Sequence, residues 1–250
     1  MPDHVSIRAA ASQADRVIEL RQYTLHPQQR DVLIDLFDSE FVETQESVGM
    51  RVMGQFRDLD DPNRFVWLRG FADMASRALG LEAFYGGPVW AAHRNAANAT
   101  MIDSDNVLLL RPAWPGAGVV LDESDRAPPG SIRLPPGLLE ATVFPLKGPA
   151  EEDLLILARE RITSVLRAGG ANVLGWYVTE PCANNFPRLP VRTGEHVLVS
   201  LAMFADDDAQ QSFATGGTWQ RDIAPELSRF LVAAPRSLRL KPTARSAMHA

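Results

Sequence analysis

The stretch Phe84–Trp90, FYGGPVW, returns in the second half of the chain as FATGGTW at Phe213–Trp219. An apolar run that ends in a basic residue and proline follows each copy, LLLRP at residues 108–112 and LRLKP at residues 238–242. A repeat of about 125 residues is too long for a solenoid unit. The 250 residues are therefore predicted to form two copies of one small domain.

The composition excludes several classes of function. A net charge of −6 argues against a broad nucleic-acid-binding surface, which needs clustered basic residues. The single cysteine, Cys182, excludes an intrachain disulfide and the usual thiolate metal sites. No apolar run reaches the length of a membrane span, and Met1–Asp15 lacks the apolar core of a secretory signal. We expect a cytoplasmic protein with no nucleic-acid or membrane partner, for which homodimerisation is permitted but not required.

Residues 113–137 lie between the two copies and contain five prolines and four glycines. Proline restricts the backbone and withholds an N–H donor, so this stretch is typical of an extended linker. The predicted organisation has five parts, in chain order: a flexible tail at 1–15, a first domain at 16–112, a linker at 113–137, a second domain at 138–243 and a tail at 244–250.

Both halves follow the order strand, helix, strand, strand, helix, strand. Pro27 suits the first turn of a helix, and the residues after it show the apolar spacing of one helix face. The strands are expected at residues 17–25, 51–57, 64–71 and 106–111, then at 138–146, 172–179, 196–204 and 238–242. This pattern predicts an α+β fold of two tandem ferredoxin-like (βαββαβ) modules.

In a ferredoxin-like module the helices cover only one face of the sheet, and an apolar bare face must be buried elsewhere. Here the second module can cover the first. The two sheets are therefore expected to pack against each other, with a cleft between them that could hold a ligand.

Three stretches of the first half, ELRQYTL at residues 19–25, FVWLRGF at 65–71 and FYGGPVW at 84–90, resemble the NIPSNAP family. The likeness covers residues 17–112, and the second half shares only the pattern. The resemblance implies the fold of the dimeric α/β-barrel superfamily, completed here within one chain. Related families include cofactor-independent monooxygenases, lactone isomerases and haem-dependent enzymes, and fold analogy alone does not choose among them.

Strand alternation divides the first strand into two faces, with Ile18 and Leu20 on one and Glu19, Arg21 and Tyr23 on the other. We expect the aliphatic face to meet the helices and the polar face to line the cleft. The same reasoning over the first three strands of each half gives the full cleft-facing set: Glu19, Arg21, Tyr23, Met53, Gln55, Trp67 and Arg69, opposite Glu140, Thr142, Phe144, Leu174, Trp176, Ser200 and Ala202.

A polar, cationic wall facing an aromatic one is typical of a small-molecule site. The expected ligand is a small apolar or aromatic molecule with a carbonyl or acidic group. Arg21 or Arg69 would hold an oxyanion, Tyr23 would donate a hydrogen bond, and His93 would serve as a general base. The substrate-binding candidates are Glu19, Gln55, Met53, Trp67, Phe144 and Trp176. The predicted function is a metal- and nucleotide-independent enzyme, monooxygenase-like or isomerase-like.

Structural alternatives accompany each of these assignments. Glu19, Arg21 and Arg69 could simply pair across neighbouring strands, because buried ion pairs are weak evidence of function. The aromatic candidates could belong to the core. His93 could be a surface residue, or an axial ligand if the protein bound haem, although no cofactor is expected. For the whole chain, the alternative is a non-catalytic binding or scaffold protein that uses its outer helices or the loop at residues 180–195.

Overall fold

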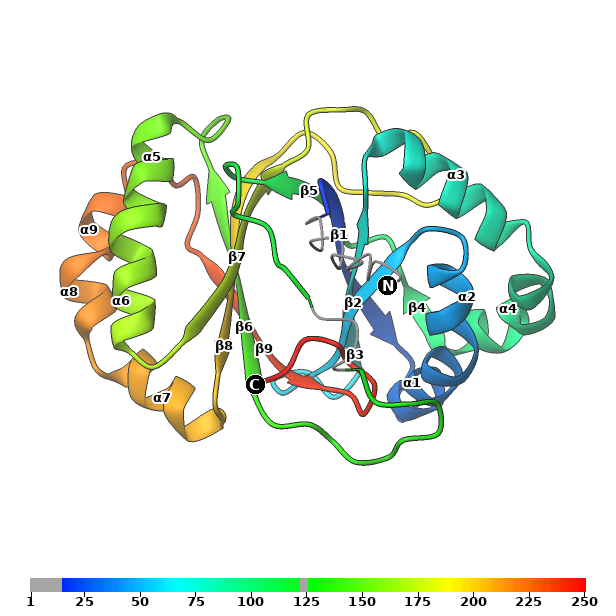
Figure 1. Ribbon diagram of the computed structural model, residues 1–250. Helices are drawn as coiled ribbons and strands as arrows, with labels where there is room; N and C mark the ends of the chain where they lie inside the picture. Colours follow the sequence, from blue (N-terminus) through cyan, green and yellow to red (C-terminus); the bar gives the residue numbers. More distant parts are fainter. Residues whose placement is uncertain (1–14, 122–125) are drawn as a thin grey trace, which may run out of the picture.

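The structure is a computed structural model that describes residues 15–121 and 126–250 (Figure 1). The predicted N-terminal tail at residues 1–15 lies almost wholly outside the described residues. The first half contributes five strands: β1 Val17–Leu25, β2 Arg51–Asp58, β3 Arg64–Phe71, β4 Met101–Asp103 and β5 Val107–Pro112. The second half contributes four: β6 Leu138–Leu146, β7 Asn172–Thr179, β8 His196–Phe204 and β9 Arg236–Pro242.

These strands close into one antiparallel barrel. The first half has the order β2-β3-β1-β5 and the second half the order β9-β6-β8-β7. β2 pairs with β9 and β5 pairs with β7, so hydrogen bonds join the two sheets at both edges. The expected barrel is confirmed. It buries one face of each sheet within a single chain, and among the described strands only the short β4 lies at an edge.

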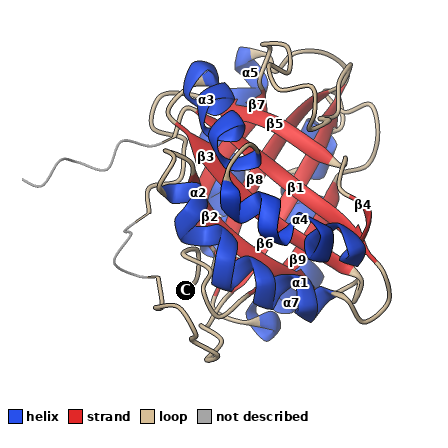
Figure 2. Ribbon diagram, turned by 90° about the vertical axis from the view of Figure 1, so that its right-hand side faces the viewer, coloured by secondary structure: helices blue, strands red, loops and turns tan. Residues whose placement is uncertain are grey.

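Two layers of helices lie on opposite sides of the barrel (Figures 1 and 2). The first half supplies α1 Arg30–Leu36, η1 Phe37–Phe41, α2 Val42–Glu46, α3 Met74–Tyr85 and α4 Pro88–Thr100. The second half supplies α5 Glu152–Ile156, η3 Leu157–Ile162, α6 Thr163–Ala168, α7 Asp207–Thr215, α8 Thr218–Asp222 and α9 Ala224–Leu227. None of the helices in the described part of the chain has the length and apolar character needed to cross a bilayer.

Matching aspartates start α3 and α7. The carboxylate of Asp73 accepts a hydrogen bond from the backbone N–H of Ser76, and that of Asp206 accepts one from Ala209. Each aspartate satisfies an N–H group that the first turn of a helix leaves free. The two caps occupy the same place in the two halves. Residues of α3 and α7 can therefore be aligned by counting from Asp73 and Asp206.

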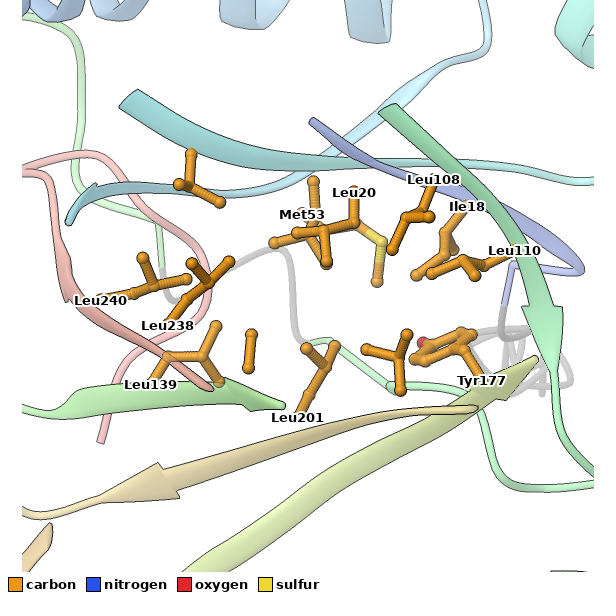
Figure 3. Packing of buried hydrophobic residues seen from close by; sticks show 14 of the residues in the cluster. Ile18, Leu20, Met53, Leu108, Leu110, Leu139, Tyr177, Leu201, Leu238 and Leu240 are labelled. Carbon is orange, nitrogen blue, oxygen red and sulfur yellow. The ribbon is translucent and has the colours of Figure 1, made fainter. Parts of the chain in front are cut away.

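The space between the two sheets is filled by aliphatic side chains (Figure 3). Ile18 and Leu20 point into it, although the alternation of β1 had been expected to turn them toward the helices. Tyr23 and Trp67 instead pack under the helices of the first half. The expected orientation of the faces is therefore wrong. Aliphatic groups fill the region most remote from water, while buried charges need the polar partners that the helices supply.

A bulge in β2 also separates two residues that were expected to share a face. The register of β2 against β3 shifts between Val52 and Gly54. Met53 consequently points into the barrel interior, while Gln55 points to the helix side and donates to the carboxylate of Asp38 at 3.1 Å. A Cβ on Gly54 would lie 2.7 Å from the ring of Phe56, which is why the bulge requires glycine.

Segments outside the two sheets close the interior. Val119, from the predicted linker, and Met248, from the predicted C-terminal tail, both belong to the cluster between the sheets. The N–H of Val119 donates to the hydroxyl of Tyr177 at 2.8 Å. The Ser246 hydroxyl accepts from the N–H of Gln55 and donates to the carbonyl of Met248. The interior is thus a packed core rather than an open cleft.

Met248→Ala tests whether the C-terminal segment is part of this core. Removing a buried methionine side chain should lower the free energy of unfolding by about 2–5 kcal/mol, because it leaves a cavity. Urea denaturation measures the loss. The matched control is Leu79→Ala on the exposed face of α3, which should change the midpoint little. Equal, small effects of the two substitutions would mean that the segment contributes nothing to the core.

Candidate functional site

The carboxylate of Glu19 is shared by three arginines beneath the helices of the first half. Arg21 Nη1 donates to its Oε2 at 2.6 Å, Arg69 Nε donates to the same oxygen at 2.8 Å, and Arg77 Nε donates to Oε1 at 2.7 Å. Each of the four side chains is at most 1% exposed. We call Glu19, Arg21, Arg69 and Arg77 the arginine cluster.

Three elements bring the arginine cluster together. Glu19 and Arg21 share one face of β1, as alternation requires, and Arg69 lies directly opposite Glu19 on β3. Arg77 comes from the first turns of α3, which crosses above the sheet. The sheet therefore sets the positions of two guanidinium groups, and the Asp73 cap of α3 sets the third.

A ring of neutral oxygens satisfies the outer nitrogens of the arginines. Arg21 Nε donates to the hydroxyl of Tyr23 at 2.9 Å, and Arg69 Nη1 donates to Oε1 of Gln45 on α2 at 3.2 Å. Arg77 Nη1 donates to Oδ1 of Asn184 at 3.0 Å and to Oδ1 of Asn185 at 2.7 Å. The two asparagines belong to the second half of the chain and reach across the barrel to this site.

Aromatic rings enclose the guanidinium groups. The Cζ atoms of Arg21 and Arg69 lie 5.6 and 5.1 Å from the ring centre of Trp67, and Arg69 also lies 5.9 Å from Tyr85. Aromatic faces attract cations, most strongly where water is excluded. The site thus combines flat apolar walls with a concentrated positive charge.

The arginine cluster has a net charge of +2 from three guanidinium groups and one carboxylate. Within the described part of the chain, Glu19 is the only carboxylate that forms an ion pair with these three arginines. Arg69 Nη2 and Arg77 Nη2 also lie within ion-pair distance of Glu19, 2.8 Å from Oε2 and 2.7 Å from Oε1. Uncompensated buried charge is costly. The excess of positive charge favours an anionic ligand.

Ionisation of the site follows from its surroundings. Burial alone would raise the pKa of Glu19, but the charges of Arg69, Arg21 and Arg77 outweigh it and hold the pKa well below its usual range. Burial raises the pKa of Tyr23 against the opposing charge of Arg21. Glu19 is therefore a permanent carboxylate and a poor base, while Tyr23 keeps its phenolic proton and can donate it to a hydrogen bond.

The second half provides an internal comparison. Its Glu140 corresponds to Glu19, yet it accepts hydrogen bonds from neutral groups, Gln210 Nε2 at 2.5 Å and Thr142 Oγ1 at 3.3 Å. Gln210 follows the Asp206 cap by four residues, as Arg77 follows Asp73. A buried glutamate is thus common to both halves, whereas the three arginines are particular to the first.

Five of the residues expected at a site do lie together: Glu19, Arg21, Tyr23, Trp67 and Arg69. They lie between sheet and helices, not between the two sheets as expected. The second wall expected to face them is elsewhere, because Phe144 and Trp176 pack under the helices of the second half. Trp176 Nε1 donates there to the hydroxyl of Thr163 at 3.0 Å.

His93 lies apart from the arginine cluster. It is about one-third exposed on α4, its Nε2 is 3.5 Å from a carboxylate oxygen of Glu40, and its ring contacts Phe41. Sequence reasoning missed four polar members of the site: Gln45, Arg77, Asn184 and Asn185. For Arg77 a signal existed, since it aligns with Gln210 relative to the two capping aspartates. The other three give no sequence signal of their own.

A pocket of about 640 Å³ opens at the junction of the two halves, next to the start of α3. Its walls include Val17 at the start of β1, Met74 at the start of α3, and Arg111, Trp114 and Cys182. Met74 precedes Arg77 by one helical turn, so the pocket adjoins the helix that carries the third arginine. Within residues 15–121 and 126–250, no three His, Cys, Asp or Glu side chains gather as a metal site.

Comparison with known proteins gives a family match for the first half and fold matches for the whole chain. Residues 18–114 match the NIPSNAP family model. An anthrone oxidase-like protein is 14% identical with a TM-score of 0.56, and the match covers 96% of this chain and 98% of that one. A monooxygenase-like protein from Fusobacterium nucleatum is 10% identical with a TM-score of 0.54, over 92% and 93% of the two chains. A NIPSNAP family protein from Agrobacterium tumefaciens is 20% identical over 40% of this chain and 90% of its own, with a TM-score of 0.37. No curated protein sequence matches the chain.

Glu19→Gln should be the most damaging single change in the arginine cluster. It leaves three buried guanidinium groups without a counter-ion, and breaking a buried pair in this way costs about 3–5 kcal/mol. Glu140→Gln is the matched control, because its direct partners are neutral and the amide can keep hydrogen bonds to them. Urea denaturation compares the two. If Glu19→Gln lowers the free energy of unfolding no more than Glu140→Gln does, the dependence of the three arginines on Glu19 is contradicted.

Asp38 predicts a specific dependence of stability on pH. Burial raises the pKa of its carboxyl to about 6, against the opposing charge of Arg245. Between about pH 4 and pH 6 the folded state holds a proton that the unfolded chain has already released. The contribution of Asp38 to the free energy of unfolding therefore falls as pH rises from about 4 to about 6. Asp38→Asn should remove that decline. Denaturation midpoints at several pH values test this, and Asp105→Asn, at an exposed position, should keep the wild-type profile.

Proposed function

We propose that this protein, whose first half is a NIPSNAP domain, is a small-molecule enzyme with its substrate site at the arginine cluster. The substrate is a small, flat molecule with a carbonyl or acidic group. One observation carries the proposal: three arginines converge on a single buried carboxylate, beside Tyr23 and Trp67. The net positive charge is suited to an anion, and the aromatic walls are suited to a planar one.

The chemistry proposed is monooxygenase-like or isomerase-like. Reactions of both kinds pass through an enolate or a related oxyanion, and fixed donors in a site without water stabilise such charge. Arg21 and Arg69 would hold the oxyanion, and the phenolic proton of Tyr23 would complete its hydrogen bonds. Glu19 would position the arginines without exchanging a proton, because its pKa is held low. No residue of the arginine cluster would act as the general base.

The common plan of the two halves supports a finer description of the fold. Apart from the short strand β4, each half has four antiparallel strands with the last-numbered and first-numbered strands adjacent, in the orders β5-β1-β3-β2 and β9-β6-β8-β7. Each half also has helices on one face only (Figure 1). We infer two ferredoxin-like modules that arose by duplication, of which the first keeps the site. The second module would then serve to close the barrel and to supply Asn184 and Asn185.

The full burial of the arginine cluster favours a second candidate, a non-catalytic binding protein. Glu19, Arg69 and Arg77 are inaccessible to solvent, so a ligand reaches them only if a covering segment moves. Slow exchange of a tightly held ligand would suit a carrier or sensor as well as an enzyme. Turnover distinguishes the two candidates, because both require the same anion site.

Substitutions copied from the second half test the proposed site while preserving the local fold. Arg77→Gln and Arg21→Thr install the residues that the second half uses beside its own glutamate. Each should weaken binding of benzoate, measured by isothermal titration calorimetry, at least tenfold. Arg94→Gln, at an exposed position of α4, is the control and should bind as the wild type does. Unchanged affinity in the first two variants would place the site elsewhere.

Turnover should follow binding. The protein would be incubated in air with aromatic acids, phenols and ketones, and products would be identified by mass spectrometry. Product formation that Arg77→Gln abolishes supports the enzyme. Binding without any product would favour the non-catalytic candidate.

A further inference from the structure

A segment of the second half covers the arginine cluster of the first. Residues 180–195 connect β7 to β8 and pass over one end of the barrel to α3 (Figure 1). Phe186 is buried against Tyr85, with ring centres 6.0 Å apart, and Arg188 pairs with Glu82 on α3. We call residues 180–195 the covering segment.

The covering segment contacts the arginine cluster through two side-chain oxygens on a single nitrogen. Asn184 Oδ1 and Asn185 Oδ1 both accept from Arg77 Nη1, at 3.0 and 2.7 Å. A carboxylate or phosphate normally meets an arginine through two parallel hydrogen bonds from two nitrogens, whereas the two asparagine oxygens share one nitrogen. Here the acceptors are neutral amides, so they satisfy the hydrogen bonds of Arg77 without balancing its charge.

We propose that Asn184 and Asn185 occupy the place of a second acidic group of the substrate, so that the ligand is a small dianion that displaces them. This inference rests on the proposed function and specifies its substrate class. The two charges of such a ligand balance the net +2 of the cluster. One acidic group would meet Arg21 and Arg69, and the other would meet Arg77.

The surroundings of the asparagines provide a path for this exchange. Asn185 Nδ2 donates to the carbonyl oxygen of Met74 at 2.6 Å, and Met74 lines the pocket of about 640 Å³. Cys182, two residues before Asn184, lines the same pocket. Movement of the asparagines away from Arg77 would therefore join the pocket to the arginine cluster. The covering segment acts as the gate, and the pocket receives the ligand before it binds.

The covering segment does not need the contact with Arg77 for its own stability. Asn184 already stabilises the segment locally, since its Nδ2 donates to the carbonyl of Leu189 and its Oδ1 accepts from the N–H of Phe186. Phe186 anchors the segment by apolar burial. The hydrogen bonds from Arg77 to Asn184 and Asn185 are charge-assisted on the arginine side alone. An anionic group of a ligand would form a stronger bond to Arg77 and displace the two amides.

Phthalate and benzoate serve as probes, because they differ by one carboxylate on the same ring. Isothermal titration calorimetry of the full-length protein should show phthalate binding at least tenfold more tightly than benzoate. Hydrogen exchange followed by mass spectrometry should show faster exchange in residues 180–195 when phthalate is bound, because the Phe186 N–H loses its bond to Asn184. Benzoate should leave that exchange unchanged.

Asn185→Asp provides the decisive variant. It supplies a negative charge to Arg77 and should weaken phthalate at least tenfold more than it weakens benzoate. Asn95→Asp adds the same charge at an exposed position of α4 and should change neither affinity.

The outcomes separate the inference from the proposed function. If benzoate binds with the expected dependence on Arg21 and Arg77, but phthalate binds no tighter and Asn185→Asp has no effect, the dianion inference is wrong and the site stands. If neither probe binds, both fail. Phthalate binding with unchanged exchange in residues 180–195 would overturn the displacement of the asparagines.

Discussion

The carboxylate of Glu19 is the interaction on which the candidate site depends. Three guanidinium groups cannot be buried together without a counter-charge, and Glu19 supplies the single one that the described part of the chain places among them. Glu19 offsets part of the positive charge of the three arginines, and the cluster keeps a net charge of +2. That residual charge is the basis of the proposal that the cluster binds an anion and does more than stabilise the sheet.

The closed barrel explains why this chemistry lies on the helix side. Two sheets that face each other exclude water from both of their inner faces, and the described side chains that line the interior are almost all apolar. Aliphatic residues such as Leu20 and Leu139 therefore fill it, and Val119 and Met248 seal it. Between sheet and helices, by contrast, Gln45 and Arg77 project from the helices and can meet the polar face of β1 and β3.

The two halves share a plan but differ in what surrounds corresponding residues. Both keep a buried glutamate on the first strand, both cap the same helix with aspartate, and both carry a glycine at a bulge in the second strand, Gly54 and Gly175. Only the first half surrounds its glutamate with arginines. The second half provides the closing sheet and the covering segment, whose Asn184 and Asn185 contact Arg77 of the first half.

The sequence by itself determined the repeat, the order of elements and the antiparallel barrel; β1, β3, β6, β7 and β8 have the bounds that were predicted. It also placed Glu19, Arg21 and Tyr23 on one face, because alternation along a strand is a local property. Only the tertiary structure decided which face meets the helices, since period-two spacing gives relative sides and not absolute ones. The bulge that turns Gln55 away from Met53, the arrival of Arg77 from α3, and the contact of Asn184 and Asn185 with a residue more than 100 positions away all arise from the path of the folded chain. Their physical cause is the need of buried charges for partners, which are chosen by proximity in space rather than in sequence.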